Sequence, residues 1–172
     1  PRFGRVAPGD IKYKDYNNDQ VVDENDAHPI GNSTIPAWNY MFSGGFKYKG
    51  FDFSVMFQGV AQRDIYLRGA NIYSFQNNGT ASNLALDSWT PTHTDASYPR
   101  LSTMNFSNNY RTSTFWRRNG SFLRLRNVQV GYELANSVTR ALRLSSVYFY
   151  VNATNLFTLD HLGKLGDAEQ DN

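Results

Sequence analysis

The sequence predicts an all-β fold in which antiparallel strands form part of the wall of a transmembrane β-barrel and are joined by long loops. Aromatic residues are abundant (12 Phe, 11 Tyr and 3 Trp), although the mean hydropathy is negative. Two regions show the two-residue alternation of strands about ten residues long. No run approaches 18 apolar residues, which excludes a transmembrane helix but not a membrane strand of about 9 to 11 residues.

Charge and cysteine content exclude several classes of function. The net charge is only +2, and the basic residues are scattered apart from Arg117, Arg118, Arg124 and Arg126, so no nucleic-acid partner is expected. The absence of cysteine excludes a disulfide framework and a thiolate metal site. The first ten residues lack the charged and apolar regions of a signal peptide, and we expect the chain to begin within a longer protein.

Residues 1–38 form an acidic, loop-like segment that contains one candidate metal site. The run DYNNDQVVDEND has the oxygen-ligand spacing of an EF-hand-like loop, with Gln20 where such a loop has glycine. This spacing predicts a weak Ca²⁺ site; the alternative is an Asx-rich turn whose side chains cap their own backbone. The candidate ligands are Asp15, Asn17, Asp19, the Val21 carbonyl, Asp23 and Asp26.

Residues 39–60 are predicted to form a β-hairpin. Aromatic and apolar residues occupy alternate positions on both sides of a two-residue turn at Lys49 and Gly50. If Tyr48 pairs with Phe51, the apolar sets of the two strands lie on one side of the hairpin.

Residues 61–120 are predicted to be a long, polar loop region. Ser82 to Trp89 favours a short helix, with Ser82 as its cap, Leu84, Leu86 and Trp89 as its apolar stripe and Pro91 after it. Two further strands are expected more weakly, near Ile11 to Lys14 and near Phe106 to Phe115. So long a loop is unusual in a compact soluble domain but ordinary on the outside of a membrane barrel.

Residues 121–157 are predicted to hold a second strand pair, Ser121 to Leu134 and Ser145 to Phe157. The apolar parity of the first strand changes near Arg126 and Asn127, which indicates a β-bulge. The short connection between the strands has room for one helical turn at Thr139 to Arg143.

Residues 158–172 are expected to begin a further loop that is cut short. The predicted strands are fewer than the eight of the smallest membrane barrels, so the chain cannot close a barrel alone. Either other segments complete the barrel, or the hairpins pack face to face as a soluble sandwich. No catalytic constellation is evident: His28, His93 and His161 are far apart, and no carboxylate pair can be placed at catalytic separation. We therefore do not expect an enzyme.

Several runs resemble the C-terminal portion of SusC/RagA-type TonB-dependent transporters in both order and spacing. They are GDIKYKDYNNDQVVDENDAHPIGN from Gly9, FDFSVMFQGVAQRDIY from Phe51, SWTPTHTDASYPRL from Ser88, GSFLRLRNVQVGYEL from Gly120 and VYFYVNATNLFTL from Val147. The resemblance implies a barrel of about 22 strands with an N-terminal plug, energised through TonB, that imports glycans or peptides across the outer membrane of a Gram-negative, Bacteroidetes-like bacterium. It also implies a SusD-like surface lipoprotein as partner and an extracellular position for the loop from Gly9 to Gly31.

Within this interpretation no plug, TonB-contacting segment or final aromatic-ended strand is recognisable. The residues expected to face lipid are Tyr40, Phe42, Phe46, Phe53, Phe57, Phe149 and Val151. Candidate ligand or lid contacts are Arg63, Tyr66, Trp89, Tyr98 and Arg100, although loop anchoring is the alternative role for the aromatic residues. A second hypothesis is a soluble, calcium-stabilised β-sandwich that binds carbohydrate; a glycosidase fragment is a third.

Overall fold

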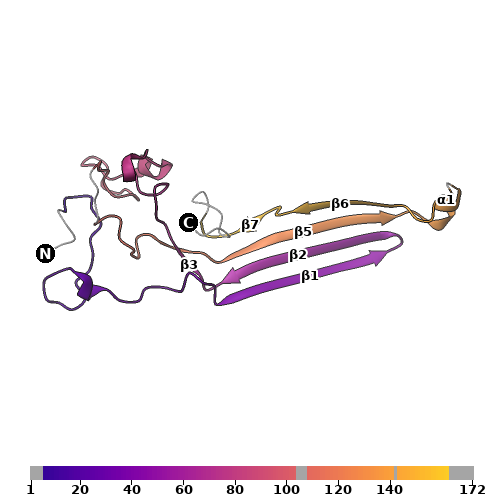
Figure 1. Cartoon of the computed structure of the whole chain (residues 1–172), viewed down its shortest axis with the longest axis horizontal. Helices are drawn as coiled ribbons and strands as arrows, with labels where there is room; N and C mark the ends of the chain where they lie inside the picture. Colours follow the sequence, from indigo (N-terminus) through magenta and orange to yellow (C-terminus); the bar gives the residue numbers. More distant parts are fainter. Residues whose placement is uncertain (1–5, 104–107, 142, 163–172) are drawn as a thin grey trace. The chain divides into compact units, whose positions relative to one another are not determined.

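The computed structural model describes residues 6–103, 108–141 and 143–162 (Figure 1). It divides into two compact units that we describe separately. The loop unit comprises Pro1–Gly31 and Ile65–Arg118, and the sheet unit comprises Asn32–Asp64 and Asn119–Asp171. Among the described residues, no helix has the length and apolar character needed to cross a membrane.

The sheet unit is built from long antiparallel strands. They are β1 (Trp38–Tyr48), β2 (Phe51–Ala61), β5 (Phe122–Glu133) and β6 (Tyr148–Thr154), which lie side by side in the order β1-β2-β5-β6 (Figure 1). The short strand β7 (Thr158–Leu159) also pairs with β5. Strand β5 pairs with β2 at the free edge of the β1–β2 hairpin, so strands that are distant in the chain are neighbours in the sheet.

The β1–β2 turn has the expected position and register. Tyr48 pairs with Phe51, which confirms the predicted hairpin. Lys49 and Gly50 both have positive φ, 49° and 87°, as the type I′ turn of a two-residue hairpin requires. A side chain at Gly50 would also meet the Glu133 carbonyl oxygen at 2.7 Å, so glycine is needed there for two reasons.

The β-bulge predicted near Arg126 and Asn127 is confirmed. On β2 the partners of Met56 and Phe57 are Asn127 and Leu125, so Arg126 is the extra residue of β5. One extra residue in a strand moves every later side chain to the opposite set of alternate positions. Apolar residues on both sides of the bulge consequently share one face of the sheet.

The second strand pair is present but shorter than expected. Strand β6 ends at Thr154 rather than Phe157, because Asn155 takes a left-handed conformation with φ 53° and interrupts the extended backbone. The connection before β6 contains helix α1 (Asn136–Ala141), which begins three residues before the expected turn at Thr139. Buried Thr139 donates its hydroxyl to the Asn136 carbonyl and thereby packs the first turn of that helix.

The loop region contains more regular structure than the sequence indicated, and in other places less. Strands β3 (Asp64–Tyr66) and β4 (Arg117–Asn119) form a two-stranded sheet that was not expected. The weak strand expected at Ile11 to Lys14 is absent, since that segment has no ladder partner. Of the one expected near Phe106 to Phe115, residues 104–107 lie outside the described residues and 108–115 form turns, not a strand.

The helix expected at Ser82 to Trp89 is a shorter 3₁₀ helix, η3 (Asn83–Asp87). Ser82 precedes it, but its side chain makes no capping hydrogen bond. The expected apolar stripe was wrong because a 3₁₀ helix has three residues per turn. Ala85 is therefore the buried residue and Leu86 remains 88% exposed. Two further 3₁₀ turns are η1 (Glu24–Asp26) and η2 (Gln76–Asn78).

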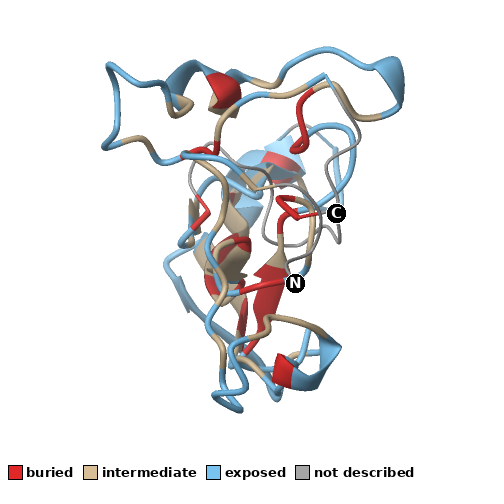
Figure 2. Ribbon diagram, turned by 90° about the vertical axis from the view of Figure 1, so that its left-hand side faces the viewer, coloured by how far each residue is buried: buried red, intermediate tan, exposed pale blue. Residues whose placement is uncertain are grey.

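The loop unit has its own small core around Trp116. This indole is 2% exposed and meets the rings of Tyr73 and Tyr98 edge to face, with centroids 5.3 and 5.8 Å apart. Its Nε1–H donates to the Asn109 carbonyl at 2.8 Å, and its own carbonyl accepts the Leu67 N–H at 2.9 Å. Among the described residues of this unit, the buried ones occur in short stretches between exposed ones (Figure 2). The loops of this unit are thus ordered by a few aromatic contacts and by hydrogen bonds to backbone.

Candidate functional site

One face of the sheet unit is apolar across β1, β2, β5 and β6. The register places Phe42 beside Phe57 and Phe57 beside Leu125, and their ring contacts follow it, with the Phe42 and Phe57 centroids 5.0 Å apart. Because of the bulge, the same face continues through Val128 and Val130 to Val151 on β6. The members are Tyr40, Phe42, Gly44, Phe46, Tyr48, Phe51, Phe53, Val55, Phe57, Gly59, Leu123, Leu125, Val128, Val130, Tyr132, Phe149, Val151 and Ala153.

Aromatic side chains border this apolar face at both ends. Tyr48, Phe51, Tyr132 and Phe149 form one continuous cross-strand row beside the hairpin turn. At the opposite end β1 supplies Trp38 and Tyr40. The eleven residues of β1 extend about 37 Å at about 3.4 Å per residue, or about 28 Å along an axis from which the strand tilts by about 40°. These dimensions match the apolar band of about 25 Å between aromatic girdles that membrane strands show.

The opposite face is polar and joined by hydrogen bonds. The Tyr148 hydroxyl donates to Asp52 Oδ2 at 2.6 Å and accepts from Gln129 Nε2 at 3.2 Å. To reach Asp52 on β2, the Tyr148 ring crosses β5 over Gly131, where any Cβ atom would overlap the hydroxyl. The two faces of the sheet therefore present different chemistry to their surroundings.

The seven residues expected to face lipid all belong to the apolar face. Several are largely exposed in the isolated chain: Phe46 and Phe149 are each 62% exposed, and Val151 is 76% exposed. Sequence parity identified this set because the two-residue period holds on each side of the bulge. That the face contacts lipid remains a prediction.

The loop unit contains an open cavity of about 960 Å³. Its walls come from three stretches, within residues 9–30, 89–99 and 111–115, all inside that unit. Of the predicted ligand contacts, Trp89 and Tyr98 line it. Trp89 packs over Gly9, where a Cβ atom would overlap the indole, so a glycine is required for this close approach. The cavity falls within the usual size range of ligand pockets.

Three of the predicted ligand contacts are engaged in structural interactions. Arg63 is buried, its Nε–H donates to the Thr34 carbonyl at 3.0 Å, and it borders a smaller cavity of about 300 Å³ in the sheet unit. Tyr66 donates its hydroxyl to the Ile30 carbonyl at 3.0 Å. The Tyr98 hydroxyl donates to the Ile72 carbonyl at 2.8 Å and accepts the Ser74 N–H at 3.0 Å. The contacts of Tyr66 and Tyr98 fit the anchoring role that was the alternative for the aromatic residues.

The side chains of the acidic loop accept hydrogen bonds from the backbone of the same loop. Asp15 accepts the N–H groups of Asn18 and Gln20, at 2.6 and 2.9 Å, and Asp26 accepts those of Tyr16 and Asp23, at 2.7 and 3.0 Å. The backbone N–H of Asp23, followed by that of Tyr16, holds the pKa of Asp26 below its ordinary value. Further caps join Asn17 to Asp19, Asp19 to Val21 and Asp23 to Asn25. Within the described ranges no three His, Cys, Asp or Glu residues are grouped to hold a metal ion.

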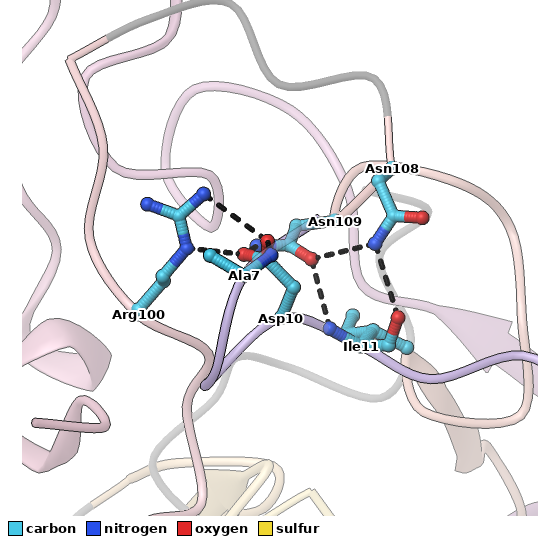
Figure 3. A network of polar contacts seen from close by, with 6 residues as sticks. All are labelled: Ala7, Asp10, Ile11, Arg100, Asn108 and Asn109. Atoms are coloured by element: carbon cyan, nitrogen blue, oxygen red, sulfur yellow. Dashed lines mark hydrogen bonds and ion pairs between the residues drawn. The ribbon is translucent and has the colours of Figure 1, made fainter. Parts of the chain in front are cut away.

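A polar network that the sequence did not indicate ties the first segment to distant loops (Figure 3). Arg100 Nε lies 2.7 Å from Asp10 Oδ1, and that Asp10 carboxylate is almost completely buried. Asn109 accepts the Ile11 N–H at 2.9 Å and donates to Asp10 at 2.9 Å, while Asn108 donates to the Ile11 carbonyl at 3.0 Å. Sequence periodicity carries no signal for contacts between residues so far apart in the chain.

A second polar cluster surrounds Asp87. Its carboxylate accepts the hydroxyl of Ser97, lies 2.8 Å from His93 Nε2 and accepts the Ser97 N–H at 3.0 Å. The Ser97 hydroxyl is the main cause, followed by His93, of a pKa of about 2 for Asp87. The cluster closes the loop between η3 and Tyr98, since the Tyr98 N–H also donates to the Asp87 carbonyl at 3.1 Å.

The fold and its faces define an antiparallel sheet with one exposed apolar side and extensive loops. Comparison with known proteins shows homology to TonB-dependent receptor P3 of Formosa agariphila, with 28% identity over 158 residues. The match covers 90% of this chain and 15% of the receptor. The predicted relation to TonB-dependent receptors is thus confirmed over this portion. No protein-family model matches the chain.

The same fold occurs in chains of the RagAB peptide importer. The open-open state matches with a TM-score of 0.65 and 22% identity, over 87% of this chain and 16% of the importer chain. The closed-closed state matches with a TM-score of 0.67 and 21% identity, over 90% and 17%. The chain therefore spans only a small part of the proteins that it resembles, which are a receptor and an importer rather than enzymes.

Proposed function

We propose that the chain is a portion of a TonB-dependent outer-membrane importer, to which it contributes barrel wall and extracellular loops. The observation that carries this proposal is the continuous apolar face of β1, β2, β5 and β6, bordered by an aromatic row beside the hairpin turn and by Trp38 and Tyr40 of β1 at the opposite end. Antiparallel strands with one apolar and one polar face are what a barrel between lipid and an aqueous lumen requires. The homology to a TonB-dependent receptor supports the same assignment.

The energetic cost of leaving this face in water favours a lipid environment. Burying one large apolar side chain contributes about 1.5–3 kcal/mol. The face carries Phe42, Phe46, Phe51, Val130, Phe149 and Val151, each at least half exposed in the isolated chain. Because 50–76% of each side chain is still exposed, burying the remainder would contribute about 5–11 kcal/mol in total, which is comparable to the whole stability of an ordinary domain. Lipid chains would remove the face from water without a second protein layer.

The proposed setting is the outer membrane of a Gram-negative, Bacteroidetes-like bacterium. The remaining barrel segments and a plug would complete the pore, TonB would act through the plug, and a SusD-like surface lipoprotein would be the partner. The cargo would be a glycan or a peptide, moved without making or breaking a covalent bond. The likeness to the RagAB peptide importer supports a nutrient cargo and a two-component assembly.

No observation favours the soluble carbohydrate-binding sandwich. Such a fold needs a second sheet packed about 10 Å from the first. The apolar face, however, is not covered in this way, since Phe46 and Phe149 are each 62% exposed and Val151 is 76% exposed.

Cysteine labelling at two adjacent positions tests the proposed function. Val151 lies on the apolar face and Asn152 on the polar face of β6. In the complete protein in lipid vesicles, a fluorophore at Val151→Cys should be quenched by nitroxide-bearing lipids. Asn152→Cys should instead react with a water-soluble maleimide. Equal quenching and equal reactivity at the two sites would refute the membrane assignment.

A further inference from the structure

The apolar face of the sheet unit ends at a lysine in the β1–β2 turn. Lys49 Nζ lies 5.2 Å from the centroid of the Tyr48 ring, and Tyr48 belongs to the aromatic row at this end of the face. An ammonium group is attracted to the π-electrons of an aromatic ring. The positive charge of Lys49 therefore lies beside the aromatic row, at the border of the apolar face.

No carboxylate neutralises Lys49 on this side of the sheet. Lys49 is exposed, and none of the ion pairs among the described residues involves it. The apolar face itself carries no charged residue. Asp52 and Glu133 each directly follow a residue of the aromatic row, so their side chains point to the polar face. Asp52 is also engaged there, since it accepts the Tyr148 hydroxyl at 2.6 Å.

The turn end of the sheet has more basic than acidic residues. Arg140 and Arg143 are exposed in the connection that contains α1, at the same end of the sheet as the β1–β2 turn (Figure 1). Residues 45–53 and 131–148 hold four basic and two acidic side chains in all, namely Lys47, Lys49, Arg140 and Arg143 against Asp52 and Glu133. The local excess of positive charge favours an anionic partner.

A phospholipid has the chemistry that this border can bind. Its acyl chains can cover the apolar face while its phosphate meets the ammonium group at the level of the aromatic row, where lysine and tyrosine commonly lie at a membrane–water interface. A free phosphate ion could use the ammonium group but not the apolar face below it. The short turns of membrane barrels lie on the periplasmic side, so the lipid would belong to the periplasmic leaflet.

We propose that Lys49 and the aromatic row of Tyr48, Phe51, Tyr132 and Phe149 bind an anionic phospholipid, with its phosphate on the Lys49 ammonium group and its acyl chains on the apolar face. This inference rests on the proposed function, since it requires the apolar face to contact lipid. It goes beyond that function because it assigns a preference for one headgroup charge to a single side chain.

Competition between two brominated lipids tests this preference. The complete protein carries a fluorophore at Val130→Cys, on the apolar face next to the aromatic row, and is placed in phosphatidylcholine vesicles. Phosphatidylglycerol or phosphatidylcholine with brominated acyl chains is added at the same mole fraction, and its quenching of the fluorophore gives its relative association constant. Phosphatidylglycerol should associate about fivefold more strongly, as expected for one lysine at an anionic surface.

A matched pair of variants locates the charge that selects the lipid. Lys49→Gln should reduce the preference about fivefold, whereas Lys49→Arg should retain it. Lys47→Gln removes the same charge from the polar face of β1, where Lys47 Nζ lies 3.9 Å from Asp52, and should leave the preference unchanged. Replacing chloride by inorganic phosphate at constant ionic strength should also leave it unchanged, because a free ion gains nothing from the apolar face.

Three results would overturn this inference: equal association of the two lipids, equal effects of Lys47→Gln and Lys49→Gln, or loss of the preference in inorganic phosphate. Strong but equal quenching by both lipids would refute the inference alone, since the face would still contact lipid. Quenching by neither lipid would refute the proposed function and this inference with it.

Discussion

Introducing a charge at Val55 is the sharpest test of which face meets lipid. Val55 pairs with Gly44 on β1 and Val128 on β5, so neither cross-strand neighbour carries a charge that could pair with an arginine there. The residue lies about 14 Å along the strand from the aromatic row at Phe51, which is about 10 Å of depth in a strand tilted by about 40°. Val55 is therefore close to the middle of an apolar band about 25 Å tall.

Val55→Arg should reduce the free energy of unfolding by about 2–4 kcal/mol in a bilayer. Ser54→Arg changes the adjacent residue on the polar face, between Gly45 and Gln129, and should cost no more than about 1 kcal/mol. The measurement is urea-induced unfolding of the complete protein in lipid vesicles, followed by tryptophan fluorescence, with Val55→Leu as an uncharged control. Equal losses for the two arginine variants would show that the faces are wrongly assigned.

Three further predictions concern the loop unit. Trp116→Ala should destabilise the unit by about 3–5 kcal/mol and speed amide exchange at Leu67, whereas Leu86→Ala should leave that exchange unchanged. Gln20→Gly should stabilise its turn by about 0.5–1 kcal/mol, because Gln20 has φ 67°, and the relief of about 1–2 kcal/mol of backbone strain exceeds the extra entropy that glycine loses on folding. Protection of the loop amides that is unchanged or lower would contradict this. The lowered pKa of Asp87 means that its contribution to stability is complete above its unfolded pKa of about 3.9 and is lost as the pH falls toward about 2. Asp87→Asn should therefore remove the corresponding acid-induced loosening, seen as amide exchange between about pH 2 and 4, and an unchanged profile would show that another group is responsible.

The sheet could be predicted from the sequence because its signals are local. The two-residue period identified the β1–β2 hairpin, and the loss of that period at Arg126 identified the bulge that places Leu125 and Val128 on one face. The period could not show which strand pairs with the free edge of each hairpin. The pairing of β2 with β5 joins residues that are 62 to 81 positions apart, such as Phe53 and Val130 at 77, and no local pattern specifies it.

The loops were predicted less well because their order comes from side chains bonded to distant backbone. Asp10 and Arg100 are 90 residues apart, and Asn108 and Ile11 are 97 apart. Single Asp and Asn residues are common in any polar loop, so nothing distinguishes the ones that join two segments. The strand expected at Ile11 to Lys14 shows the same limit: its alternation is real, but a strand is assigned only where a neighbouring backbone pairs with it.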